Sequence, residues 1–218
     1  MKLYPIMLNM SGRRAVIIGG GDVALRKLSD LIDAGANIKI ISPEFNDEII
    51  KTSELYKERI ILIKRKYERN DLDAGMLVFS ATNDANVNRE IFNDAKEKNI
   101  LINAVDDPAN CSFYVPSFIR RGDLIFSVST SGASPAMAAR LRREMESHIP
   151  ENIEAMLEGL NKARILLKED KAFSNIDSSQ RGDILKEIAS DDQLLASLIS
   201  CKDEDVVDFL LKVKDSSI

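Results

Sequence analysis

One segment decides the fold of this chain: Ala15-Val16-Ile17-Ile18-Gly19-Gly20-Gly21-Asp22-Val23-Ala24. Its first four residues are apolar and mostly β-branched, which is typical of a buried strand. Three glycines follow, and apolar residues then recur with helical spacing over 22–34, as far as Gly35, a residue type that commonly ends a helix. The sequence therefore predicts a strand, a tight turn and a helix in direct succession.

The turn has the pattern G-x-G-x-x-A, with Gly19, Gly21 and Ala24 in the key positions. The first glycine permits a turn that a Cβ atom would block, the second lets a pyrophosphate approach the main chain, and the alanine lets helix and strand pack closely. The N–H groups at the start of the helix are suited to binding an anion. In this context the pattern predicts a dinucleotide site; the alternative is a tight βα turn that binds nothing.

Further along the chain, the strand-like runs lie over 38–41, 60–63, 76–80 and 100–105, and a helix is predicted over 86–98. The runs are almost continuously apolar, as expected of strands buried on both faces. Strands that alternate with helices imply right-handed crossovers. The predicted fold class is therefore α/β, with a Rossmann-type doubly wound parallel sheet.

The pattern changes after this sheet. A strand is predicted over 124–130, followed by a turn and a helix with Ser134 as its N-cap and Pro135 as its first residue. From Pro150 onward the chain has all-helical spacing, and the excess of acidic residues lies there. We therefore expect a Rossmann domain over 1–112, a small α+β region over 113–149 and a helical region over 150–218.

The composition of the chain argues against several classes of function. The formal net charge of the 218 residues is −5, which does not favour nucleic-acid binding. Two cysteines exclude a disulfide scaffold, and one histidine excludes a His-rich metal site, so no metal site is predicted. Because no apolar run approaches the ~18 residues that span a bilayer, we expect a cytoplasmic protein with no membrane partner.

Candidate cofactor residues follow the second predicted strand, which ends in Ser42-Pro43-Glu44. Ser42 takes the place where such folds usually carry an acidic residue for the ribose hydroxyls. Glu44 either holds the ribose or is a solvated loop carboxylate. No Arg or Lys lies between Ile41 and Ile50 to bind a 2′-phosphate, so the sequence favours NAD over NADP.

Thr82 and Asn83 follow the fourth predicted strand. Ligands of doubly wound sheets bind outside the carboxyl ends of the strands, so these side chains are expected to meet the ribose or the nicotinamide. The alternative is that one of them caps the next helix.

Residues 4–147 together resemble the precorrin-2 dehydrogenase family, the N-terminal module of siroheme synthase, some members of which are also sirohydrochlorin ferrochelatases. Beyond Tyr4-Pro5-Ile6, the resemblance rests on these passages: Val16-Ile17-Ile18-Gly19-Gly20-Gly21-Asp22-Val23-Ala24-Leu25-Arg26-Lys27, Ala81-Thr82-Asn83-Asp84, Asn103-Ala104-Val105-Asp106-Asp107-Pro108 and Ser129-Thr130-Ser131-Gly132-Ala133-Ser134-Pro135-Ala136.

The resemblance implies NAD-dependent oxidation of precorrin-2 to sirohydrochlorin, with Fe²⁺ insertion in bifunctional relatives. It also implies a homodimer formed by the second and third parts of the chain. The family's cofactor contacts map to Asp22, Val23, Pro43 and Glu44, and its key carboxylate maps to Asp106. Together with the motif, this gives the predicted cofactor set Gly19, Gly20, Gly21, Asp22, Val23, Ala24, Ser42, Pro43, Glu44, Thr82 and Asn83.

Asp106 follows the fifth predicted strand, at the same sheet edge as the glycine turn. A carboxylate there can accept a proton while the nicotinamide takes a hydride, or take pyrrole N–H protons during metal insertion. The alternative is an Asx-turn residue before Pro108. If Asp106 is in the cleft, we expect Asp107 to point away.

A tetrapyrrole substrate carries many carboxylates and needs cations and anion-binding backbone. The region over 120–134 offers these groups, although any one arginine there can equally be a solvated surface charge. The predicted substrate-binding residues are Arg120, Thr130, Ser131, Gly132 and Ser134.

Two functions follow from the sequence. The first is an NAD-dependent precorrin-2 dehydrogenase, with or without ferrochelatase activity. The alternative is a non-catalytic module that senses NAD or NADH and acts on a partner through the helical tail. The passages around Asp106 and Ser134 favour the enzyme, because a sensor needs neither.

Overall fold

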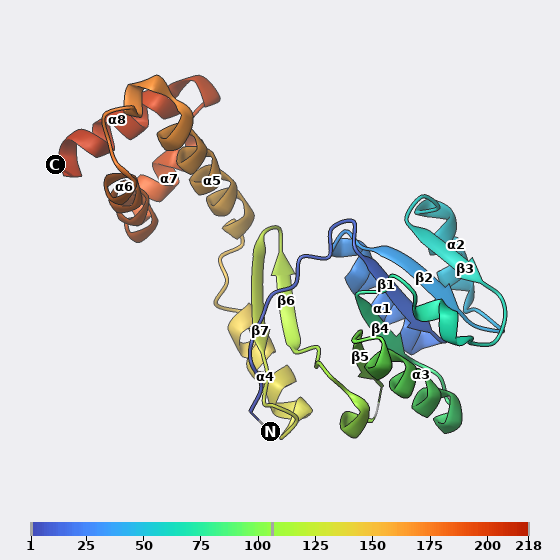
Figure 1. The fold of residues 1–218 in the computed structure, drawn as a ribbon. Helices are drawn as coiled ribbons and strands as arrows, with labels where there is room; N and C mark the ends of the chain where they lie inside the picture. Colours follow the sequence, from blue (N-terminus) through green and yellow to red (C-terminus); the bar gives the residue numbers. More distant parts are fainter. Residues whose placement is uncertain (1, 106, 218) are drawn as a thin grey trace. The chain divides into compact units, whose positions relative to one another are not determined.

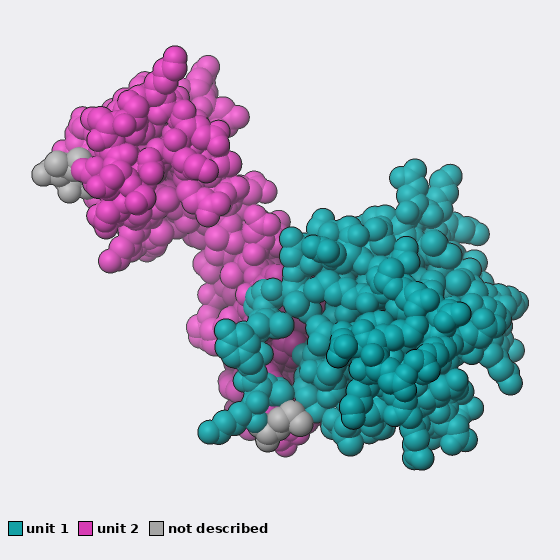
Figure 2. All heavy atoms as spheres, in the orientation of Figure 1, with its two compact units in different colours: residues 1–115 teal, residues 116–218 magenta. Residues whose placement is uncertain are grey.

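The computed structural model describes residues 2–105 and 107–217. The chain forms two compact units, Met1–Val115 and Pro116–Ile218 (Figure 2). The finer division into parts that end at residues 112 and 149 stays a prediction.

A five-stranded parallel sheet is the centre of the first unit (Figure 1). Its spatial order is β3-β2-β1-β4-β5, so the chain starts in the middle, builds outward to β3 and then crosses to the other half. All the strands predicted for this sheet are present, with ends within one residue of those predicted. The strands are β1 (Arg14–Ile18), β2 (Asn37–Ile41), β3 (Ile60–Ile63), β4 (Leu77–Ser80) and β5 (Leu101–Ala104).

Helices cover both faces of the sheet. On one face α1 (Asp22–Asp33) and α2 (Asp47–Leu55) pack over a core that includes Ile17 and Leu28. On the other face α3 (Ala85–Glu97) packs over a core that includes Val16 and Ile91. Neighbouring residues of β1 point to opposite faces, so both cores depend on this one strand. The predicted α/β fold class with a doubly wound sheet is confirmed.

This topology creates a crevice in a defined place. The helices that follow β1 and β4 lie on opposite faces of the sheet, and these two strands are neighbours. The chain therefore diverges at the carboxyl ends of β1 and β4, which is where doubly wound folds bind their ligands.

The second unit starts with an antiparallel hairpin of β6 (Ser117–Arg121) and β7 (Leu124–Val128), against which α4 (Pro135–Glu146) packs. A helical bundle follows, with its own core around Leu167, Phe173 and Leu210. It consists of α5 (Ile153–Glu169), α6 (Ser178–Ser190), α7 (Asp192–Ser200) and α8 (Val206–Ser217), joined in part by short 3₁₀ turns. Across residues 2–105 and 107–217, no helix has the length and apolar character needed to cross a membrane.

A buried carboxylate braces the first unit at the end of β3. Asp71 lies on the 3₁₀ turn Arg69–Leu72 and is 2% exposed. Both its oxygens accept hydrogen bonds from the Arg65 guanidinium, at 2.7 and 2.8 Å, and Lys39 of β2 lies 3.6 Å away. Burial by itself would raise the pKa of Asp71, but the Arg65 hydrogen bonds, the Glu68 N–H and the nearby Lys39 hold this pKa below its usual value.

We expect Asp71→Asn to lower the free energy of unfolding at pH 7 by about 2–4 kcal/mol, because it leaves two cations without their buried partner. The ionised carboxylate stabilises the fold above the unfolded pKa of about 4, and this contribution disappears as the pH falls towards the lower folded pKa. Urea unfolding at several pH values should therefore show the difference between wild type and variant shrinking from pH 5 downward. A difference that stays constant down to pH 2 would contradict this role.

Candidate functional site

The glycine turn at the end of β1 is packed against two other main-chain segments. Gly19 has a φ of +123°, and a Cβ atom there would lie 2.2 Å from the Ala81 carbonyl oxygen. A Cβ on Gly20 would lie 2.1 Å from the Glu44 carbonyl oxygen. Both positions therefore require glycine. The turn is also tied to its surroundings, because the Asn46 N–H donates to the Gly20 carbonyl at 2.7 Å.

Gly21 is different, since nothing lies within 4 Å of the place where its Cβ would be. It is the N-cap of α1, and no side chain caps the first N–H groups of that helix. The Asp22 carboxylate is held to one side by the Asn46 amide, at 2.8 Å. Open space beside uncapped helix N–H groups is what a pyrophosphate needs, so these residues fit the phosphates of a dinucleotide.

An open cleft of about 710 Å³ surrounds this turn. Of the predicted cofactor residues, only Ala24 is absent from its lining, and Ala24 is instead fully buried between helix and sheet, as its place in the motif requires. The structure thus brings the other ten together along one cleft: Gly19, Gly20, Gly21, Asp22, Val23, Ser42, Pro43, Glu44, Thr82 and Asn83.

The cap of α3 is Asp84, whose carboxylate accepts from the N–H groups of Asn86 and Val87. The alternative that Thr82 or Asn83 caps this helix is therefore wrong. The Thr82 hydroxyl instead donates to the Asn88 side-chain oxygen at 2.6 Å, and the Asn88 amide donates back to the Thr82 carbonyl at 3.0 Å. This pair of hydrogen bonds fixes the loop after β4 at the edge of the cleft.

Eight residues that line the same cleft were not in the predicted cofactor set. Tyr67 donates its hydroxyl proton to Asp94 at 2.8 Å, and burial together with the Asp94 carboxylate raises its pKa, so the hydroxyl stays protonated. Lys66 and Tyr67 follow β3, whose carboxyl end lies at the same sheet edge as those of β1 and β4. The rule applied to Thr82 would have found them. The lining residues outside the predicted cofactor set are Ile18, Phe45, Asn46, Lys66, Tyr67, Ala81, Asp84 and Val87.

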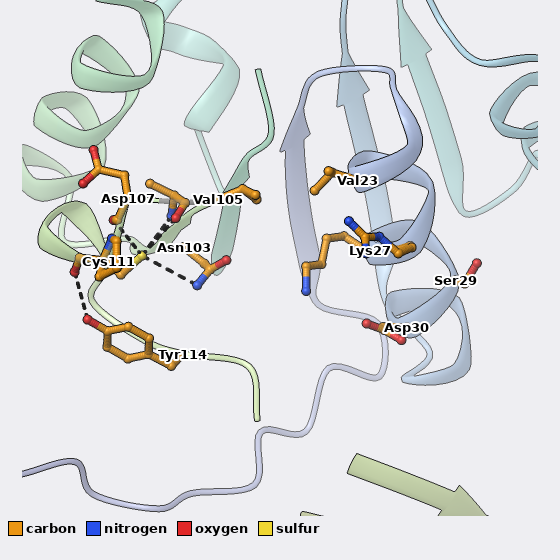
Figure 3. A pocket seen from close by; sticks show the side chains of 12 residues that line it. Val23, Lys27, Ser29, Asp30, Asn103, Val105, Asp107, Cys111 and Tyr114 are labelled. Carbon is orange, nitrogen blue, oxygen red and sulfur yellow. Dashed lines mark hydrogen bonds between the residues drawn. The ribbon is translucent and has the colours of Figure 1, made fainter. Parts of the chain in front are cut away.

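A second cavity, of about 610 Å³, lies between α1 and the segment after β5 (Figure 3). Val23 and Lys27 line it from α1, and Asn103, Val105 and Cys111 line it from the other side. Val23 also lines the dinucleotide cleft. The two cavities therefore meet at the first turn of α1.

Cys111 holds the wall of this second cavity in place. Its sulfur accepts from the Ala104 N–H at 3.2 Å and lies 3.2 and 3.3 Å from the carbonyl oxygens of Ala104 and Asp107. Burial raises the pKa of the Cys111 thiol, which keeps its proton available for donation. The Asn103 amide nitrogen donates to the Phe113 carbonyl at 3.0 Å. These contacts fix the two ends of the segment 104–111.

The predicted catalytic residue, Asp106, lies outside the described residues. Val105 and Asp107, which precede and follow it, both line the second cavity. The Asp107 carboxylate accepts a hydrogen bond from Asn110 at 2.6 Å, and Figure 3 shows it on the side away from α1.

In the second unit, the predicted substrate-binding residues form the turn before α4. Ser134 accepts from the Met137 N–H at 3.2 Å and is the N-cap of α4, with Pro135 first in the helix, as predicted. Thr130 accepts from the Ser134 N–H at 3.0 Å, and Ser131 and Gly132 have positive φ angles of 52° and 87°. Arg120 is exposed on β6. The role of these residues in binding a substrate stays a prediction.

No group of three or more His, Cys, Asp or Glu within residues 2–105 and 107–217 is arranged to hold a metal ion.

Comparisons with known proteins show which families and relatives this chain is similar to. A family model described as putative NAD(P)-binding matches residues 6–117, and one described as the central part of a sirohaem biosynthesis protein matches residues 121–148. Siroheme synthase of Methylobacillus flagellatus is 39% identical over 150 residues, which is 69% of this chain and 32% of the relative. Siroheme synthase of Acinetobacter baylyi is 36% identical over 159 residues, or 72% of this chain and 34% of the relative.

A solved structure described as SirC, precorrin-2 dehydrogenase, has a TM-score of 0.76 and 26% sequence identity, covering 98% of this chain and 100% of that one. The chain spans about a third of the length of the curated relatives it matches.

The fold and the cleft together define a Rossmann-type dinucleotide-binding protein. The chain belongs to the family described as putative NAD(P)-binding, and it is similar to siroheme synthases and to the structure described as SirC, precorrin-2 dehydrogenase. The family resemblance predicted from the sequence is confirmed, as is a cofactor of the NAD(P) type.

We expect Gly21→Ala to weaken NAD binding about tenfold or more, because the new methyl group occupies the space left for the pyrophosphate. The melting temperature should stay within about 2 °C of wild type, since no atom lies near that methyl group. Isothermal titration calorimetry and thermal melts measure the two effects. Gly182→Ala, in α6, is the matched control, because its Cβ would also meet no atom within 4 Å and it lies in the other unit. Equal NAD affinity in both variants would contradict the assignment of the cleft.

Proposed function

We propose that this protein is an NAD-dependent dehydrogenase that oxidises precorrin-2 to sirohydrochlorin, and that it acts in the cytoplasm. The observation that carries the proposal is the junction of two cavities at Val23. One cavity has the glycine turn and uncapped helix N–H groups that suit a dinucleotide. The other adjoins it and is lined by Val105 and Asp107, the sequence neighbours of the predicted catalytic residue Asp106.

The similar proteins support the substrate. The structure described as SirC, precorrin-2 dehydrogenase, matches along nearly the whole chain, and the curated relatives are siroheme synthases. Because this chain spans about a third of those relatives, their other activities are not carried over to it.

The chemistry requires a hydride acceptor and a proton acceptor on neighbouring sites. Bound NAD⁺ supplies the hydride acceptor. We assign the proton to Asp106, since a carboxylate at the carboxyl end of a strand beside the cofactor can act as a general base. Asn103 supports the same wall: its nitrogen is bound to the Phe113 carbonyl, and a side-chain amide oxygen is a group that can accept a hydrogen bond from a pyrrole N–H.

The alternative function, an NAD(H) sensor, makes a different prediction for one experiment. Wild-type protein with precorrin-2 and NAD should show an absorbance increase at 340 nm. A sensor would bind NAD or NADH by calorimetry and leave precorrin-2 unchanged. Adding Fe²⁺ or Co²⁺ to sirohydrochlorin with the same protein tests metal insertion, which stays a prediction.

We expect Asp106→Asn to lower kcat with precorrin-2 by about 100-fold or more, because an amide cannot take up the proton. NAD affinity should stay within about twofold of wild type. Asp107→Asn is the comparison variant, because the Asp107 carboxylate is bound to Asn110, and it should affect kcat much less. If Asp107→Asn is the variant that abolishes turnover, the catalytic role belongs to Asp107.

We further propose that the protein is a homodimer in which α4 lies at the interface. Met137, Leu141 and Met145 are four residues apart on α4, so they share one face, and they are 45%, 39% and 39% exposed. A stripe of three large apolar side chains on one helix is typical of a surface that a second protein chain covers. The second copy of this chain is the partner that we propose, in line with the dimer that the family resemblance implies.

We expect Leu141→Asp to weaken dimer formation by about 100-fold or more, because it buries a carboxylate in an apolar contact. Sedimentation equilibrium over a range of concentrations measures the dissociation constant. Arg143→Asp introduces the same residue on the opposite face of α4 and should leave the dimer intact. A wild-type protein that sediments as a monomer at 100 µM, about ten times a typical working concentration for such an experiment, would overturn the proposal.

A further inference from the structure

Lys27 lies on the second turn of α1, next to the fully buried Leu28, and its side chain lines the second cavity. The ammonium nitrogen is 5.7 Å from the centre of the Phe79 ring, so the apolar stem and the cation both lie against the sheet side of the helix. Figure 3 shows the amine leaving α1 on the side that faces Asn103 and Cys111 across the cavity.

The charge of Lys27 is only partly compensated. Burial lowers the pKa of the amine, Asp30 opposes this shift, and Arg26 adds to it. No carboxylate within residues 2–105 and 107–217 lies in salt-bridge contact with the Lys27 nitrogen. A cation drawn out of water in this way is unfavourable, and a bound anion would offset that cost.

Other polar groups around the cavity are already engaged within the protein. The Asp107 carboxylate accepts from Asn110, and the Tyr114 hydroxyl donates to the Pro108 carbonyl at 2.8 Å. The Cys111 thiol is bound to the main chain. Arg26 also lines the cavity but is exposed to solvent, whereas Lys27 is half-buried. Lys27 is therefore a half-buried cation on the cavity wall, and its ammonium group can donate hydrogen bonds to a ligand.

We propose that Lys27 binds a carboxylate of the tetrapyrrole substrate and so fixes the position of the ring beside the cofactor. The inference rests on the proposed function, because it takes the second cavity as the substrate site. Val23 and Lys27 are four residues apart on α1 and so on one face of it, about one helical turn from each other. A carboxylate held by Lys27 lies one turn away from the junction of the two cavities.

The experiment compares Lys27→Met, which keeps the apolar stem, with Lys27→Arg, which keeps the charge. We expect Lys27→Met to raise the KM for precorrin-2 about tenfold or more, the effect of one lost charge-assisted hydrogen bond. Its kcat should fall less than about threefold, and its NAD affinity should not change. Lys27→Arg should recover most of the affinity. Lys96→Met, on the exposed side of α3, is the matched control.

A second measurement does not depend on turnover. Sirohydrochlorin is titrated into each protein without NAD, and its dissociation constant should rise about tenfold in Lys27→Met. In the wild type this affinity should also fall as the pH rises and Lys27 loses its charge, earlier than for an ordinary lysine. Asp30, Arg26, Asp107, Cys111 and Tyr114 also face the cavity, but Lys27→Arg retains all of them. If wild type loses more affinity for sirohydrochlorin at alkaline pH than Lys27→Arg does, the difference is due to deprotonation of Lys27.

The outcomes separate the inference from the proposed function. If wild type oxidises precorrin-2 and Lys27→Met has the same KM and the same sirohydrochlorin affinity, the inference is wrong and the function stands. If wild type does not oxidise precorrin-2 but binds sirohydrochlorin through Lys27, the dehydrogenase is wrong and the carboxylate contact holds. If wild type neither oxidises precorrin-2 nor binds sirohydrochlorin, both are wrong. Should Lys27→Met unfold, Lys27→Gln tested beside Lys27→Arg gives the same comparison.

Discussion

The backbones at the ends of β1, β2 and β4 approach each other so closely around Gly19 and Gly20 that no side chain fits between them. The main chains that follow β2 and β4 lie directly against the turn. Carbonyl oxygens of these segments are within 2.2 Å of the positions that Cβ atoms on Gly19 and Gly20 would take. This close approach brings three strand ends to one edge of the sheet. It also leaves Gly21 facing open space, so the same constraint that shapes the turn keeps the phosphate position empty.

Around that constraint, the protein uses its own polar groups to fix loops and leaves selected groups for ligands. Thr82 and Asn88 bind each other beside one cavity, and Cys111 binds the main chain on its own segment beside the other. None of these groups needs a ligand to be satisfied, so the walls of both cavities are shaped before anything binds. Two groups that can still meet a ligand are the first N–H groups of α1 and the Lys27 amine. Both are positive, which suits a pyrophosphate in one cavity and a carboxylate in the other.

Much of the first unit could be predicted from the sequence. Buried parallel strands have a strong apolar signal, and the glycine motif is typical of a strand, a tight turn and a helix in succession. The strands of the central sheet and α1 follow from these two signals alone. The prediction missed α2 because only Ile49 of that helix is buried, so its spacing is weak. It missed β6 because Ser117-Phe118-Ile119-Arg120-Arg121 is short and half polar. In the cleft, Lys66 and Tyr67 were missed because they are distant in sequence and join the site only through the order of the strands.

Helix α1 serves both cavities, and this has a mechanical consequence. Its first turn faces the dinucleotide cleft, and its next turn carries Lys27 into the other cavity, while Ala24 and Leu28 lock the same rod to the sheet. Because α1 is rigid, a tilt that moves its first turn also moves the turn that carries Lys27. A substitution beneath the helix that shifts it by an ångström would therefore disturb the alignment of the two reactants with each other, even where each still binds.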